Sequence, residues 1–138
     1  VAIKFKKQSR KIFIMDINTA FHPFDIRGDY PAVVDEQMAS LIGQYVRSYL
    51  DGEIIIASDN RESSPKLRAA LHIGIDLGEL PTPLFYYAVC KLKAAGGIMV
   101  TASHVYASQN GFKLVHANAL PFNEGEILEL KNYVSKQH

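Results

Sequence analysis

The chain has 138 residues, of which 48% are hydrophobic, so it is long enough to bury the core of one domain. Its 15 Lys and Arg residues are balanced by 14 Asp and Glu residues, which gives a formal net charge of +1. This balance excludes the basic excess that is typical of nucleic-acid-binding proteins, and no apolar run is long enough to span a bilayer.

Cysteine usage and the N-terminus indicate the compartment. Cys90 is the single cysteine, so no internal disulfide can form, and the apolar helical pattern around it predicts a buried structural thiol. The N-terminal segment is basic and lacks the cleavable apolar core of a signal peptide. We therefore expect a reducing, cytoplasmic setting. Because the chain opens on Val1 rather than methionine, we expect a fragment or a processed form.

The first 31 residues divide into an extension and a candidate phosphate-binding turn. Residues 1–20 are predicted to be an N-terminal extension, with the β-prone run 11–15 as an edge strand or a packing arm. Residues 21–31 contain Asp25, Arg27 and Gly28. An arginine on a tight turn suits bidentate phosphate binding. The alternative interpretation of the pattern is a surface ion pair between Asp25 and Arg27.

A helix followed by a buried strand is predicted next. Apolar residues recur at three- and four-residue spacing over 35–50, which predicts a helix that packs on the core. The β-branched run 53–57 is typical of a buried parallel strand. It ends in a polar loop that contains Asp59 and Arg61. Those two side chains are as well suited to bracing a neighbouring loop as to contacting a substrate.

The following crossover is unusually short. Ser64 and Pro65 suggest a capped helix start, and the helix pattern continues through Leu71. The run 69–78 leaves too little chain for the end of a helix, a turn and a strand. We therefore expect about eight residues to be absent between Ile75 and Asp76.

Three further elements complete the predicted fold. Thr82 is expected to cap a helix that buries Phe85, Val89 and Leu92 and ends at the glycines 96–97. Residues 112–115 should form a strand, for which the antiparallel edge of the sheet is the expected place. The last helix should start near Asn123, with a capping box and an apolar stripe. The fold class is therefore α/β: a single three-layer α/β/α domain over residues 1–138, with a mostly parallel sheet and one antiparallel edge strand.

The segment 97–104 carries the strongest chemical signal. A short apolar run turns abruptly into small and polar residues, which is typical of a buried strand that feeds a loop. The loop presents the Ser103 hydroxyl and the His104 imidazole, and the Lys113 ammonium follows ten residues after the serine. A nucleophile or phosphate carrier needs such neighbours. An ordinary loop serine and a solvated lysine are the alternative interpretation.

Several ordered motifs resemble domain I of the α-D-phosphohexomutases, the phosphomannomutase/phosphoglucomutase family. They are Thr-Ala-Ser-His at 101–104 with Asn-Gly-Phe-Lys at 110–113, Phe-Asp-Ile-Arg-Gly at 24–28, Asp59 and Arg61 before Ser-Ser-Pro at 63–65, Asp-Leu-Gly at 76–78, and Pro-Thr-Pro-Leu at 81–84. The resemblance runs from about residue 21 to the end of the chain. It covers most of the sequence and is specific for the family rather than for one substrate.

The resemblance implies an enzyme that interconverts hexose 1- and 6-phosphates through a bisphosphate intermediate. Ser103 would carry the phosphoryl group, Lys113 would transfer a proton, His104 would contact phosphate, and Arg27 would stabilise the transferring group. Asp59, Arg61 and Asn110 would support the active loop or contact phosphate.

The resemblance also implies a cofactor and an activator. Mg²⁺ would be bound by a phosphoryl oxygen on Ser103 and by ligands from a second domain. A hexose 1,6-bisphosphate would act as the activator, and a sugar phosphate would be the substrate.

The chain also departs from the family pattern. Ala57 and Ser58 stand where Gly-Arg is usual, Val105 and Tyr106 stand where Asn-Pro is usual, and residues 108–109 differ as well. The domains II–IV that bind metal, sugar and phosphate are absent from the sequence. We therefore expect the chain to depend on the remaining domains of a parent mutase and to have little or no activity alone. The alternative is a non-catalytic phosphate-binding or regulatory module that retains the fold.

Overall fold

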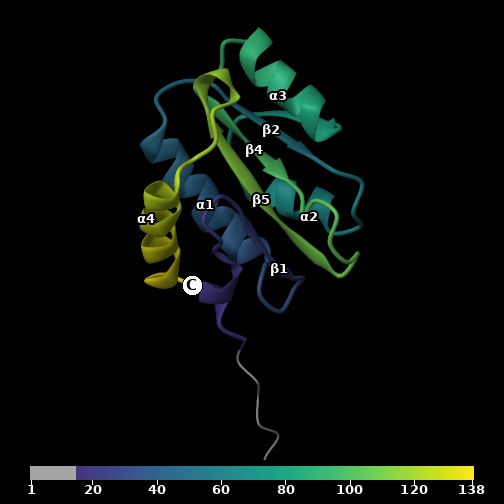
Figure 1. Ribbon diagram of the computed structural model, residues 1–138, viewed down its shortest axis with the longest axis vertical. Helices are drawn as coiled ribbons and strands as arrows, with labels where there is room; N and C mark the ends of the chain where they lie inside the picture. The colour runs from purple at the N-terminus through teal and green to yellow at the C-terminus, as the bar shows by residue number, and fades with distance from the viewer. Residues whose placement is uncertain (1–14) are drawn as a thin grey trace, which may run out of the picture.

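The computed structural model describes residues 15–138. The expected N-terminal strand at 11–15 therefore falls almost entirely outside the described residues. Figure 1 shows a single body built of a sheet and its covering helices. The elements in chain order are η1 (Ile17–Ala20), β1 (Ile26–Asp29), α1 (Glu36–Tyr49), β2 (Ile54–Ser58), α2 (Ser64–Ala70), β3 (Ile75–Glu79), α3 (Thr82–Lys91), β4 (Gly96–Val100), β5 (Gln109–His116), η2 (Ala117–Ala119) and α4 (Glu124–Ser135).

The sheet confirms the predicted α/β class. Its five strands have the order β1-β5-β4-β2-β3, in which β2 is parallel to both β3 and β4. Strand β5 pairs antiparallel with β4 on one side and with β1 on the other. The segment 112–115 thus lies in β5, one place inside the sheet, and β1 is the edge strand that is paired antiparallel.

Helices cover the two faces of the sheet unequally, as Figure 1 shows. Helices α1, α2 and α4 form one core with alternate strand residues such as Ile56, Ile98 and Leu114. Within the described residues, α3 alone packs on the opposite face, where Phe85 and Val89 meet a second, smaller core. Helix α3 packs mainly on β2 and β4, and Val115 of β5 is also buried in this core.

The expected absence of about eight residues between Ile75 and Asp76, relative to the family, stays a prediction. The two residues are consecutive in β3 and pair with Ile55 and Ile56 of β2. The crossover is short because α2 has seven residues and the chain then turns through left-handed backbone at His72 (φ 51°) and Gly74 (φ 73°). A side chain at Gly74 would overlap the Ile54 carbonyl oxygen, so glycine permits this tight turn.

The predicted details of two helix starts are also corrected. The N-cap of α2 is Ser63, whose side chain makes no capping bond. The predicted cap, Ser64, is the first residue of the helix and donates its hydroxyl to Asp59. Thr82 is the first residue of α3, and Pro81 occupies the capping position.

The far end of α3 differs from the prediction as well. This helix ends at Lys91 rather than at the glycines, which begin β4. Leu92 is therefore 53% exposed. Cys90 is exposed rather than buried, because it neighbours the core residue Val89 and points to another side of the helix.

Two helices form as the sequence predicts. Asp35 caps α1 through a bond from the Met38 amide, and the buried residues of α1 follow the predicted spacing. Asn123 and Glu126 form the capping box of α4, above a buried stripe that includes Ile127, Leu130 and Val134.

Glu126 joins α4 to the rest of the domain. Its carboxylate accepts hydrogen bonds from the Tyr49 hydroxyl (2.7 Å) and the Asn123 amide (2.7 Å), and it lies 2.8 Å from His116 Nε2. Burial raises the pKa of Glu126, but the bonds from Tyr49, the Asn123 backbone and His116 outweigh it and lower the net pKa. The same contact raises the pKa of Tyr49 to about 12.

Glycine at position 43 permits the contact between α1 and α2. A Cβ at Gly43 would overlap the Leu71 carbonyl oxygen and lie 2.9 Å from its carbonyl carbon. We expect Gly43→Ala to lower the free energy of unfolding by roughly 1–3 kcal/mol, because the backbone clash exceeds the helix-propensity gain of alanine. Urea denaturation measures this.

Gly125→Ala is the matched control for that substitution. Its Cβ would meet no backbone atom outside its own helix within 4 Å and would lie 3.2 Å from the Asn123 side-chain oxygen that caps α4, which needs to shift only slightly, so we expect a loss below about 1 kcal/mol and smaller than that of Gly43→Ala. Equal effects of the two alanines would contradict the packing argument.

A pH series tests the role of Glu126. Because the folded protein lowers the pKa of this carboxyl, its contribution to stability is present above the ordinary value of 4.5 and is lost as the pH falls through the lowered pKa. We expect Glu126→Gln to lower the thermal midpoint at neutral pH, and the difference from the unsubstituted chain to shrink in acid. A difference that stays constant down to acid pH would show that ionisation is not involved.

Candidate active site

A cleft lies at the carboxyl ends of β2 and β4, where ligands bind in open α/β sheets. Its volume is about 1040 Å³. The loop after β2, the loop after β4, the start of α3 and one residue of β5 form its walls. The lining residues are Asp59, Asn60, Arg61, Glu62, Thr82, Pro83, Thr101, Ser103, His104, Val105, Ala107 and Lys113.

The structure brings together five of the side chains predicted from the sequence. Ser103 and His104 are exposed on the loop after β4, and Asp59 and Arg61 follow β2. Lys113 is half-buried on β5, where it pairs with Met99 and faces the same side as α3. The Ser103 hydroxyl makes no hydrogen bond to any residue in 15–138. An exposed hydroxyl, an imidazole and an ammonium thus line one cleft.

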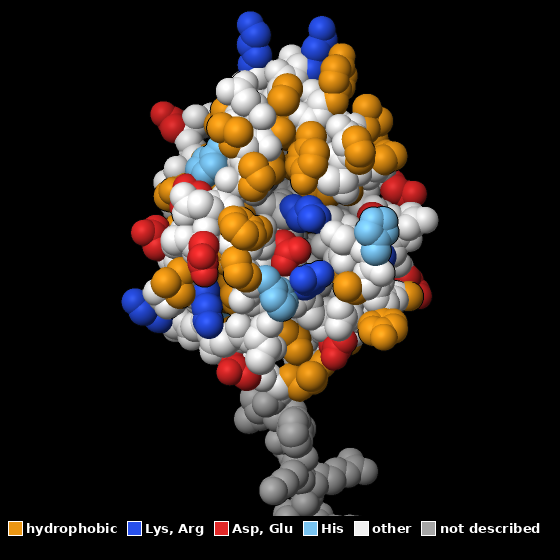
Figure 2. Space-filling model, viewed as in Figure 1, with side chains coloured by type: hydrophobic (Ala, Val, Ile, Leu, Met, Phe, Trp, Pro, Cys, Tyr) orange, Lys and Arg blue, Asp and Glu red, His pale blue; other side chains and the backbone are white. Residues whose placement is uncertain are grey.

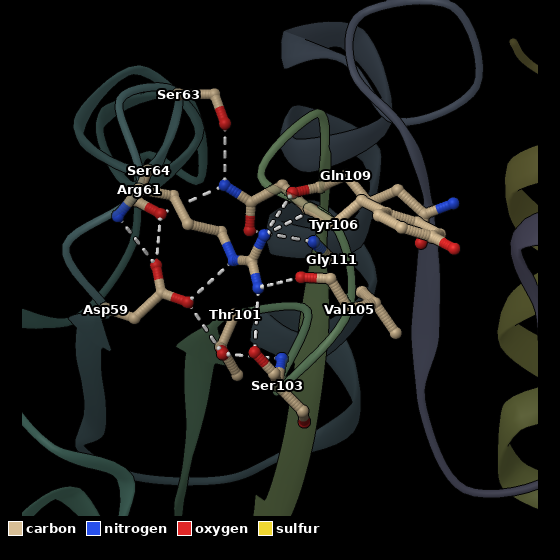
Figure 3. Close-up of polar contacts among 11 residues, drawn as sticks. Asp59, Arg61, Ser63, Ser64, Thr101, Ser103, Val105, Tyr106, Gln109 and Gly111 are labelled. Carbon is tan, nitrogen blue, oxygen red and sulfur yellow. Dashed lines mark hydrogen bonds and ion pairs between the residues drawn. The ribbon is translucent and has the colours of Figure 1, made fainter.

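Arg61 holds the loop after β4 by its backbone. Its Nη1 donates to the carbonyl oxygens of Tyr106 (2.7 Å) and Gln109 (3.0 Å), and its Nη2 donates to those of Ser103 (2.7 Å) and Val105 (3.0 Å). Nε donates to Asp59 at 3.0 Å. All five N–H groups of the guanidinium are used, as Figure 3 shows. Arg61 therefore braces the loop and has no donor left for a phosphate.

Each oxygen of the Asp59 carboxylate accepts two hydrogen bonds. One oxygen accepts from the Arg61 amide (3.1 Å) and the Ser64 hydroxyl (2.7 Å). The other accepts from Arg61 Nε (3.0 Å) and the Thr101 hydroxyl (2.8 Å). The carboxylate thus connects the end of β2, the first turn of α2 and the end of β4 (Figure 3).

Asn110 supports the loop from the other face of the sheet. Its side chain is fully buried and donates to the hydroxyls of Ser63 (2.8 Å) and Ser64 (2.9 Å), while its oxygen accepts from the Gly111 amide (2.8 Å). It is not among the residues that line the cleft. Asn110 is therefore in a position to support the loop rather than to contact a ligand in the cleft.

Arg27 lies outside the cleft, in a neighbouring hollow of about 420 Å³ that also contains His22 and Gln109. Val105 lines both hollows, so the two adjoin. Arg27 lies opposite Gly111 in the sheet, and its Nε is 3.6 Å from the Asp25 carboxylate. Arg27 therefore forms the ion pair with Asp25 and also lies close to the loop that contains Ser103.

Figure 2 shows the charge distribution on the face that Figure 1 presents. Lys and Arg side chains lie near its middle with an acidic side chain between them, and hydrophobic side chains gather above them over α3. The exposed apolar side chains of that helix include Leu84 (45%) and Tyr87 (59%).

The described residues do not form a magnesium site by themselves. No group of three His, Cys, Asp or Glu side chains in 15–138 is arranged to hold a metal ion. Asp59, the carboxylate in the cleft wall nearest to Arg61, already accepts four hydrogen bonds.

Within residues 15–138, no helix has the length and apolar character needed to cross a membrane.

Two residues of this network were not predicted from the sequence. The Thr101 and Ser64 hydroxyls both donate to Asp59, and each is at most 5% exposed. A serine followed by proline is typical of a helix cap, so the sequence around Ser64 does not indicate a contact with Asp59. The position of Thr101, at the end of a buried strand and two residues before Ser103, is the one sequence feature that points to a role beside the loop.

Comparisons with known proteins agree with this geometry. Residues 18–138 match the family described as phosphoglucomutase/phosphomannomutase, alpha/beta/alpha domain I. A phosphohexose mutase of Xanthomonas campestris is 41% identical in an alignment of 113 positions that covers 75% of this chain and 25% of that protein. A phosphomannomutase of Escherichia coli is 37% identical in an alignment of 114 positions that covers 76% of this chain and 25% of that protein.

A solved structure has the same fold. The phosphoglucomutase/phosphomannomutase family protein of Burkholderia thailandensis superposes with a TM-score of 0.71 at 26% identity, covering 86% of this chain and 30% of that one. The fold is therefore that of an α/β/α mutase domain. The chain belongs to the phosphoglucomutase/phosphomannomutase family, as its domain I. It spans about a quarter of the length of the Xanthomonas and Escherichia relatives.

Proteolysis tests the brace formed by Arg61. Lysine has three donors on a single nitrogen and cannot reproduce the five-donor fork. Tyr106 is 81% exposed in the braced loop, and its aromatic side chain makes it a chymotrypsin site. We expect Arg61→Lys to speed cleavage after Tyr106 by at least roughly tenfold, because hydrogen bonds from a charged donor are lost.

Arg47→Lys is the control for that experiment. Arg47 donates to a single carbonyl, that of His72, away from the active loop. We expect its cleavage rate after Tyr106 to match that of the unsubstituted chain. Equal rates in the two lysine variants would mean that other contacts hold the loop.

Proposed function

We propose that this chain is the phosphoserine-bearing domain of a phosphohexomutase, which interconverts hexose 1- and 6-phosphates through a bisphosphate. The observation that carries the proposal is the exposed Ser103 hydroxyl. It lies on a loop whose backbone is fixed by Arg61, in a cleft that Lys113 and His104 also line. Family membership supports the same reaction class.

In the proposed step, Ser103 Oγ attacks the phosphorus of a hexose bisphosphate. The new bond joins phosphorus to Oγ, and the bond from phosphorus to the sugar oxygen breaks. Lys113 is the proposed proton-transfer group: it takes the proton of the serine hydroxyl and passes one proton to the departing sugar oxygen, so that no net proton is gained or lost. Phosphoryl transfer depends mainly on positioning and on neutralising the charge of the phosphoryl oxygens. Returning the phosphoryl group to the other hydroxyl of the sugar would complete the exchange.

The other predicted site residues have supporting roles in this proposal. His104 would contact the phosphoryl group from the same loop. Arg27 would leave Asp25 and stabilise phosphoryl oxygens from the adjoining hollow. Asp59, Arg61 and Asn110 would keep the loop in place.

Mg²⁺ and a hexose 1,6-bisphosphate activator also remain part of the proposal. The phosphoryl oxygen on Ser103 would be the one metal ligand from this chain, and the metal would neutralise charge on the phosphoryl group. The other ligands would come from outside the described residues.

The rest of a parent mutase is the expected partner. Since the chain spans about a quarter of its relatives, residues that select the sugar and hold its distal phosphate would lie in further domains. We therefore propose that the chain alone has little or no mutase turnover, and that the parent enzyme works in the cytoplasm on a sugar phosphate.

A second candidate function is a non-catalytic phosphate-binding or regulatory module. Two observations favour it. The loop contains Val105 and Tyr106 where the family pattern has Asn-Pro. The Arg27 side chain is paired with Asp25 and lies outside the cleft that contains Ser103.

Phosphoryl transfer to the chain distinguishes the two functions. The purified protein is incubated with glucose 1,6-bisphosphate and Mg²⁺, and its intact mass and peptide map are followed with time. We expect the mass of one phosphoryl group to be added at Ser103 and to be removed again by a hexose monophosphate. Ser103→Ala should gain nothing. Lys113→Gln should slow the transfer by about 10²–10⁴-fold, the usual contribution of a proton-transfer group.

Lys136→Gln is the charge-matched control, since Lys136 lies just beyond α4 and does not line the cleft. We expect it to be labelled at the unsubstituted rate. A chain that stays unlabelled both alone and when the remaining domains of a parent mutase are supplied would contradict the enzyme proposal and favour the non-catalytic module. Equal labelling of Ser103→Ala would exclude Ser103 as the carrier.

A further inference from the structure

Ser103 has a backbone conformation that a side-chain-bearing residue rarely adopts. Its φ is +59°, in the left-handed region that favours glycine. A residue stays there only when the surrounding contacts hold it. Both peptide groups that flank Ser103 must therefore be fixed by something stronger than loop geometry alone.

Two side chains hold these peptide groups, and both are bound to the same oxygen atom. The Ser103 amide donates to the Thr101 hydroxyl at 3.0 Å, and the Ser103 carbonyl accepts from Arg61 Nη2 at 2.7 Å. The Thr101 hydroxyl and Arg61 Nε both donate to Asp59 Oδ2, at 2.8 and 3.0 Å. Figure 3 shows this arrangement around Ser103.

Chemistry fixes which atom donates and which accepts in the two hydrogen bonds that link Ser103 to Thr101 and Thr101 to Asp59. A backbone N–H can only donate, so the Thr101 oxygen must accept from Ser103. An ionised carboxylate can only accept, so the single proton of the Thr101 hydroxyl must point to Asp59. Asp59 thereby turns the lone pairs of the hydroxyl toward Ser103. Since Thr101 is 5% exposed, water has little access to compete for either bond.

We propose that Thr101 is a positioning residue. Its hydroxyl, oriented by Asp59, holds the Ser103 amide and so keeps the Ser103 side chain directed into the cleft for phosphoryl transfer. Thr101 contacts the backbone of the reacting residue and not the phosphoryl group itself. The kinetic part of this inference rests on the proposed function, whereas the backbone part stands without it.

The test compares two substitutions that separate the hydroxyl from the methyl group. Thr101→Val removes the hydroxyl and keeps the shape, and Thr101→Ser keeps the hydroxyl and removes the methyl. Hydrogen exchange of the Ser103 amide, followed by NMR, reports the backbone contact. The rate of Ser103 labelling by glucose 1,6-bisphosphate, measured over a range of concentrations, reports transfer.

We expect Thr101→Val to lose protection of the Ser103 amide and to slow labelling at saturating bisphosphate by roughly ten- to a hundredfold, with the half-saturating concentration unchanged. Thr101→Ser should restore both properties. If the valine variant does not give the dispersed NMR spectrum of a folded chain, Thr101→Ala replaces it, because alanine places no methyl group against the carboxylate.

The outcomes separate the two proposals. An unchanged Ser103 amide in the valine variant would overturn the inference, as would a serine variant that is as impaired as the valine one. Lost protection with normal labelling would also overturn it. If the unsubstituted chain takes up no phosphoryl group, the proposed function fails, and the exchange measurement alone decides whether Thr101 holds Ser103.

Discussion

Two strand ends are joined through the carboxylate of Asp59, which lies beyond β2 and binds Thr101 beyond β4 as well as Arg61 and Ser64. Removing this acceptor would leave a largely buried guanidinium without its counter-charge and the proton of the fully buried Ser64 hydroxyl without its acceptor, both of which are costly in a low dielectric. The loop that presents Ser103 has no regular secondary structure of its own. Its shape is set by polar contacts to the neighbouring strand.

Most of the fold was predictable from hydrophobic pattern and turn chemistry. The periodicity over 35–50 and the capping box at Asn123 correspond to real helices because each has a single buried face. The crossover after β2 was not predictable. Its brevity depends on left-handed backbone at His72 and Gly74, and the first of these is not a residue that signals such a conformation. Exposure of Leu92 depends on where α3 ends, which the apolar composition of this segment conceals.

The sequence was enough to predict which residues of the candidate site come together at the ends of the strands. It was not enough to predict which hydrogen bonds those residues make. Polar residues after two parallel strands must meet at one edge of the sheet, so Asp59, Arg61 and Ser103 come together. That Arg61 uses four guanidinium donors on the loop and the fifth on Asp59 depends on three-dimensional geometry that residue spacing does not encode. The same holds for Arg27, whose position across Gly111 follows from strand pairing.

The antiparallel pairing of β4 and β5 fixes which way Lys113 points. Lys113 faces the cleft because it alternates with Phe112 and Leu114, which point into the core under α1 and α4. Shifting β5 by one residue against β4 would exchange these faces and bury the ammonium among apolar side chains. Because this register, and not the loop, sets the direction of Lys113, loop residues such as Val105 and Tyr106 can differ without turning the ammonium out of the cleft.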